Sequence, residues 1–195
     1  MVNLSQSKTK SEKATRKKSP SQRLWSIHWW MAAVYILLFV GGTFMSQLPR
    51  DASFRGELYD FHKSLGVLTM GLLTARILFL LIKLQQQRKP TAKRPLPKWE
   101  RVQAIALHTV LYAFMLIVPL SGWFFSNSYG KDVAFFGLPM PTLFPADKAM
   151  GELGRSIHFW IAYIFLAFIT LHTLDQRKFL RATFRRWLQF TRKPA

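Results

Sequence analysis

SIHFWIAYIFLAFITLHTL, residues 156 to 174, contains no charged side chain. Its 19 residues come close to the roughly 20 that a helix needs to cross a bilayer core about 30 Å thick. The stretch also carries two histidines, His158 and His172. Because soluble cores do not require so long an apolar run, we predict a membrane-spanning helix here.

Three more stretches have a similar length and character, so four spans are predicted in all. They cover about residues 24–46, 61–83, 102–125 and 156–174. We therefore expect an all-α integral membrane four-helix bundle that occupies residues 23–180. Residues 1–22 are expected to form a disordered basic cytoplasmic tail, and residues 181–195 a basic amphipathic cytoplasmic tail.

The net charge of +19 is unevenly distributed between the connections. Of the 28 Lys and Arg residues, 21 lie before the first predicted span, in the linker 83–101, or after the fourth span. The basic residues of the other two connections are balanced by acidic ones. The positive-inside rule then predicts that both termini are cytoplasmic. Since orientation accounts for the charge, we expect membrane lipid as a partner and no nucleic acid.

The chain has no cysteine. This excludes disulfides, iron–sulfur clusters, thiolate-ligated haem and covalent c-type attachment. Any bound metal must therefore use histidine.

All five histidines lie within or at the edge of a predicted span, where ionisable side chains are costly and usually functional. A single membrane histidine can equally be a hydrogen-bonding contact between helices. Depth favours the functional interpretation: His28 and His172 fall near the cytoplasmic face (the inner level), and His62 and His158 near the opposite face (the outer level). Each level can supply one six-coordinate haem with an axial imidazole from each side.

His158 and His172 are 14 residues apart, which separates them by about 21 Å along a helix and by about 40° around it. One helix face can thus present a ligand to each of two stacked haems.

Arg76 follows His62 by the same 14 residues, so it shares that face at the inner level. The predicted spans contain no acidic residue, and haem propionates would provide the anionic partner that a buried arginine needs. The alternative is that Arg76 snorkels to the headgroups. His108 could hydrogen-bond a propionate, line a quinone pocket or replace one of the four ligands; we favour a non-ligand role, because the other four histidines already pair by depth.

The outer loop, residues 126–155, holds an apolar patch at residues 135–141 that is too short to span. We expect this patch to lie at the membrane interface as a lid over the outer end of the bundle.

Taken in order, these features resemble the prokaryotic cytochrome b561 family, which is related to the cytochrome b subunits of formate dehydrogenase and nickel-iron hydrogenase. The resemblance covers roughly residues 23–180 and rests on these motifs: Ser26-Ile27-His28-Trp29, His62-Lys63-Ser64-Leu65-Gly66 with Arg76, His108 with Tyr112, Pro119 and Gly122, Phe136-Gly137-Leu138-Pro139-Met140-Pro141, His158 and His172.

The resemblance implies two haem b groups, one bound by His28 with His172 and one by His62 with His158, which is the pairing that depth gives independently. It also implies quinone as a redox partner, the bacterial plasma (inner) membrane as the location and, in some members, oxidation of superoxide at the outer surface.

The leading hypothesis is a membrane cytochrome that transfers electrons across the membrane to or from quinone. One alternative is a superoxide:quinone oxidoreductase, in which Lys63, Lys131 or Arg155 would attract the anion. Another is a haem-bearing anchor subunit that docks a dehydrogenase or hydrogenase subunit through its basic tail. A histidine-based proton transporter is disfavoured, because the spans lack Asp and Glu.

Overall fold

Four long helices and one small hairpin make up the computed structural model, which describes residues 19–86 and 97–177 together with Arg181 and Arg185. The helices are α1 (Pro20–Gln47), α2 (Arg55–Gln86), α3 (Lys98–Ser128) and α4 (Lys148–Asp175), and the strands β1 (Ala134–Phe135) and β2 (Leu138–Pro139) lie between α3 and α4. Each helix is long and apolar enough to cross a membrane. The prediction of an all-α membrane bundle is therefore confirmed, while nearly all of both expected tails falls outside the described residues.

Polar caps define where two of the helices begin. Ser19 and Gln22 form a reciprocal capping box before α1, with side chain to backbone distances of 3.3 and 2.9 Å. At α4, the Asp147 carboxylate accepts a hydrogen bond from Met150 N at 3.1 Å. Both helices consequently start ahead of the apolar stretches that predicted them, α4 by about two turns.

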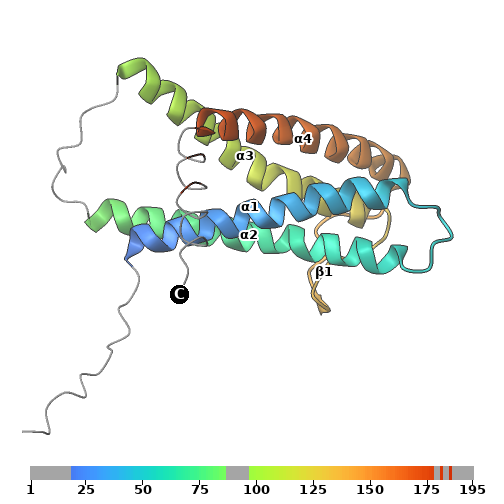
Figure 1. Cartoon of the computed structure of the whole chain (residues 1–195). Coiled ribbons are helices and arrows are strands. Elements are labelled where there is room, and N and C mark those ends of the chain that lie inside the picture. The colour runs from blue at the N-terminus through green and yellow to red at the C-terminus, as the bar shows by residue number, and fades with distance from the viewer. Residues whose placement is uncertain (1–18, 87–96, 178–180, 182–184, 186–195) are drawn as a thin grey trace, which may run out of the picture.

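The helices pack as two hairpins. The closest packing joins α1 with α2 and α3 with α4, and α2 also packs against α3. Gly154 allows α4 to approach α3, because a Cβ there would lie 2.8 Å from the Phe124 ring. Figure 1 shows that α1 begins and α4 ends at the same end of the bundle. That arrangement is the one expected from an even number of spans.

The outward faces of the bundle are apolar. Val40 is 65% exposed, and large apolar side chains such as Leu78, Leu116 and Ile164 are also exposed. Such a surface is unfavourable in water and suits hydrocarbon, where helices satisfy their own backbone hydrogen bonds.

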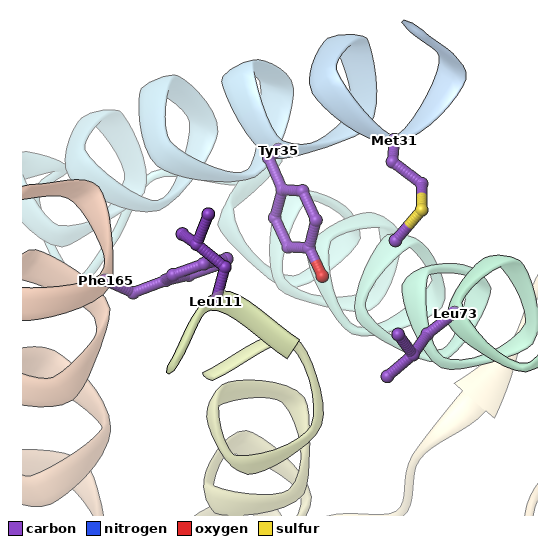
Figure 2. Packing of buried hydrophobic residues seen from close by; sticks show 5 residues of the cluster. All are labelled: Met31, Tyr35, Leu73, Leu111 and Phe165. Atoms are coloured by element: carbon purple, nitrogen blue, oxygen red, sulfur yellow. The ribbon is translucent and has the colours of Figure 1, made fainter. Parts of the chain in front are cut away.

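The buried core draws one or two side chains from each helix. Met31 and Tyr35 come from α1, and Leu73, Leu111 and Phe165 come from the other three helices (Figure 2). Phe165 is fully buried, and its ring packs edge-on against Tyr35 at 5.1 Å between centroids. Phe165 lies seven residues from each histidine of α4. This packed layer therefore separates the inner and outer levels.

The hairpin of the outer loop is attached to α2 (Figure 1). The buried Ser64 hydroxyl accepts a hydrogen bond from Phe136 N at 3.0 Å and lies 3.0 Å from the Ala134 carbonyl oxygen. Phe136 and Gly137 form the turn with φ of +47° and +90°. Positive φ at both positions gives the tight hairpin turn of type I′, which a phenylalanine adopts only with strain. Ser64 thus holds a strained, outward-facing apolar tip against Phe61 of α2.

Candidate metal centres

The structure brings the outer-level histidines together. His62 projects from α2 and His158 from α4, and their ring centroids lie 6.4 Å apart with the ring planes at 85°. Neither helix packs closely against the other among the described residues. The two imidazoles therefore meet across the interior of the bundle.

The inner-level histidines are arranged in nearly the same way. His28 of α1 and His172 of α4 have ring centroids 6.2 Å apart and planes at 78°. Their helices also meet through side chains at the buried layer, where the Phe165 ring of α4 packs against Tyr35 of α1. Helix α4 thus faces a histidine from a different helix at each level, and its closest packing is against α3.

The spacing of both pairs suits two imidazoles on opposite sides of one metal ion. A ring nitrogen binds a metal at about 2 Å, which puts the ring centre roughly 3 Å from the metal and the two centres roughly 6 Å apart. Within the described residues there is no group of three or more His, Cys, Asp or Glu side chains that could enclose a bare ion. A porphyrin supplies the four remaining ligands itself, so two histidines are sufficient for haem.

The outer imidazole of His158 is oriented by its neighbours on α3. Its Nδ1 lies 3.1 Å from the Val118 carbonyl oxygen and 2.9 Å from Ser121 Oγ. Ser121 donates its own proton to that carbonyl at 2.7 Å, so both oxygens can accept from an N–H at Nδ1. A proton on Nδ1 leaves Nε2 with a free lone pair, which is the form that binds a metal.

Two glycines make room for the outer imidazoles. A Cβ at Gly122 would lie 3.1 Å from Cε1 of His158, and a Cβ at Gly42 would lie 3.2 Å from Cε1 of His62. No other helical glycine contacts a histidine in this way. Larger residues at these two positions would push the imidazoles out of place.

The inner level has a different environment. The Trp25 ring stacks against His28 with centroids 5.9 Å apart and planes at 25°, and Trp29 meets the same imidazole edge-on at 5.8 Å. Nδ1 of His172 is buried without a hydrogen-bond partner in the described part of the chain. Aromatic packing against His28 therefore takes the place of the hydrogen bonds that orient His158.

Arg76 lies at the inner level, as its spacing from His62 predicts. Its Nε donates to the Tyr112 hydroxyl at 2.8 Å, and its Nη1 donates to the Leu24 carbonyl oxygen at 3.3 Å. Within the described residues its guanidinium has no carboxylate partner, since the one ion pair there joins Lys63 to Asp60 at 2.7 Å. Three of its five N–H donors remain for an anion.

His108 lies beside the inner pair instead of apart from it. Its ring centroid is 5.1 Å from that of His172, and its Nδ1 is 2.6 Å from the Ala104 carbonyl oxygen. The side chain is exposed. The structure therefore gathers three imidazoles and Arg76 at the inner level.

The three outer cations are not equivalent. Lys63 is bound to Asp60 and donates to the Asp132 carbonyl oxygen at 2.9 Å, so it is not a free positive charge. Lys131 and Arg155 are exposed.

Sequence reasoning missed the roles of Gly42 and Ser121 beside the outer histidines. A glycine or serine at the depth of a histidine was the available signal, but it does not indicate which neighbouring helix the residue faces.

Comparison with known proteins identifies a family and a relative for this chain. The family model described as prokaryotic cytochrome b561 matches residues 19–175. Cytochrome b561 homolog 2 of Escherichia coli (strain K12) is 26% identical over 151 residues, which cover 75% of this chain and 77% of that protein.

Proposed function

The chain belongs to the prokaryotic cytochrome b561 family, and on this basis we propose that it carries two haem b groups and transfers electrons across the membrane to or from quinone. Membership makes it a membrane b-type cytochrome of electron transfer. The observation that supports two haems is the presence of two imidazole pairs, 6.2 and 6.4 Å apart between centroids.

In this proposal His28 and His172 bind the inner haem, and His62 and His158 bind the outer haem. The bound haems supply one-electron redox chemistry, and the protein supplies ligands, orientation and electrostatics. Helix α4 contributes one ligand at each level and so sets their separation at about 21 Å along its axis. Ligation by two imidazoles leaves no open position on the iron, which favours electron transfer over oxygen chemistry.

Arg76 is assigned to the propionates of the inner haem. Its free donors and its position beside His28 and His172 support this role, because a guanidinium binds carboxylates in a planar, two-pronged way. His108 is assigned a non-ligand role near that haem, at a propionate or a quinone. Its ring centroid is only 5.1 Å from that of His172, closer than the roughly 6 Å expected for two ligands on opposite sides of one iron.

The proposed location is the bacterial plasma membrane, with the end of the bundle where α1 begins and α4 ends facing the cytoplasm. The excess of basic residues in the connections at that end supports this orientation. Superoxide oxidation at the outer face would depend on the exposed Lys131 and Arg155, since Lys63 is already paired with Asp60.

The decisive experiment is the ratio of haem to protein in the purified chain. We expect two haems in the wild type, one after His158→Ala and one after His172→Ala. His108→Ala is the matched control, because it removes an imidazole from the inner level and is expected to leave both haems. A single haem in the wild type, or an unchanged content after either ligand substitution, would contradict the proposal.

A further inference from the structure

Like the Ser128 hydroxyl at the outer end of α3, the indole N–H of Trp123 is a buried polar group without a partner within the described residues. The side chain is only 7% exposed, and its Nε1 makes no hydrogen bond there. A buried donor without an acceptor is costly, and native proteins rarely leave one. The position therefore indicates an acceptor that the described residues do not provide.

The helical register puts Trp123 on the interior face of α3. It follows Gly122, which packs against His158, and it lies 11 residues after Tyr112. Eleven residues are close to three full turns, so Trp123 and Tyr112 share one face of the helix. Tyr112 uses this face to meet Arg76 of α2.

The same helical spacing shows which residue of α2 lies opposite Trp123. The two helices pack together and run in opposite directions (Figure 1). Eleven residues back from Arg76 is the buried Leu65, one turn from His62. Trp123 thus lies at the depth of the outer imidazole pair, on the face that holds Tyr112 at the inner level.

No acidic side chain of the described residues is free to accept this N–H inside the bundle. Asp60, the acid nearest His62 in the sequence, is bound to Lys63, and its side chain is exposed. Nδ1 of His158 already has the Val118 carbonyl and Ser121 as partners. A carboxylate carried by a cofactor between His62 and His158 would accept this hydrogen bond.

We propose that Trp123 donates its indole N–H to a propionate carboxylate of the outer haem, an inference that rests on the function proposed above. The face of α3 that includes Tyr112 and Trp123 then provides a polar contact at each level, with Arg76 beside Tyr112 at the inner one. Hydrogen bonds to an ionised acceptor are short and strong, which explains why a tryptophan is tolerated in this buried position.

This contact adjusts the potential of the outer haem. A donor on the propionate offsets part of its negative charge, and that charge favours the ferric iron, which carries one more positive charge than the ferrous iron. Trp123 therefore raises the midpoint potential of the outer haem. Hydrogen bonding around the cofactor is a general means by which a protein tunes haem potential.

Trp123→Phe tests the proposal, because it removes the N–H and keeps an aromatic ring. We expect two haems, with the reduction equilibrium of the outer haem shifted about threefold to tenfold toward the ferric form; tenfold corresponds to about 59 mV for one electron. The outer haem is identified as the one lost in His62→Ala. Trp160→Phe is the matched control, since Trp160 lies at the same level on α4 and is 63% exposed; it should change neither midpoint.

Redox-difference infrared spectra of wild-type protein labelled with indole-15N tryptophan provide a check without substitution. A label-sensitive N–H band is expected when the outer haem changes oxidation state. Unchanged midpoints in Trp123→Phe with both haems present, an equal shift of both haems, or the absence of the band would each overturn the assignment. A wild-type protein without two haems would instead refute the function proposed above.

Discussion

Replacing Gly122 with alanine tests whether His158 holds a metal at the outer level. A Cβ at this position would lie 3.1 Å from Cε1 and 3.4 Å from Nδ1 of the His158 ring. Non-bonded carbon atoms are most stable at about 3.5–4.0 Å, so the imidazole must retreat by roughly half an ångström. The retreat takes the ring away from the helix that orients it.

The size of the effect follows from the contacts that the retreat disturbs. The hydrogen bond from Nδ1 to the Val118 carbonyl is already 3.1 Å long, and stretching it by half an ångström would break it. Groups that orient a metal-binding histidine typically contribute 10- to 100-fold in affinity. We therefore expect Gly122→Ala to bind the outer haem about tenfold more weakly and the inner haem as before.

The assay is haem content over a range of haem supply during expression, together with electron paramagnetic resonance of the ferric haems. We expect a loss or displacement of one low-spin signal only. Gly41→Ala is the matched control, because a Cβ there has nothing within 4 Å. Full haem content with both signals unchanged in Gly122→Ala would refute the reasoning, since the crowded imidazole would then have no part in coordination.

Three other substitutions test the surroundings of the two levels. Arg76→Gln removes the positive charge and should lower only the midpoint potential of the inner haem in a spectroelectrochemical titration; an unchanged midpoint potential would show that Arg76 does not contact that haem. Ser64→Ala removes the hydroxyl that holds the strained Phe136 turn. The hairpin should then detach more easily by about 1–2 kcal/mol, and a protease should cut the outer loop correspondingly faster. Equal cleavage rates would mean that the hairpin is held by other contacts. Phe165→Ala opens a cavity between the levels and should destabilise the bundle by about 3 kcal/mol, measured as a lower thermal unfolding temperature with both haems still bound; an unaltered temperature would show that the layer has no structural role.

The outer loop contains one feature that the sequence pattern predicts and one that it does not. Its apolar patch was expected at the interface, and the exposed tip formed by Phe136 and Leu138 is consistent with that place. The hairpin itself was not expected, because its turn depends on positive φ at a phenylalanine, which local preference disfavours. It is held by Ser64, a residue about 70 positions earlier in the chain.

The sequence by itself determined the number of helices and the depth of each histidine. Apolar run length selects membrane spans, and a rise of about 1.5 Å per residue fixes how deep each residue lies once the direction of its helix is known. Depth alone was therefore enough to group His28 with His172 and His62 with His158, and the structure brings both groups together.

Only the tertiary structure decided how the helices are rotated and which neighbours they meet. The contact of Gly122 with His158, and that of His108 with His172, depend on the azimuth of two helices at once. Azimuth is set by side-chain packing between segments far apart in the chain, and a single sequence carries no local record of it. The depth of a residue along its helix is a local property of the chain, whereas the side chains that it faces on other helices depend on the whole molecule.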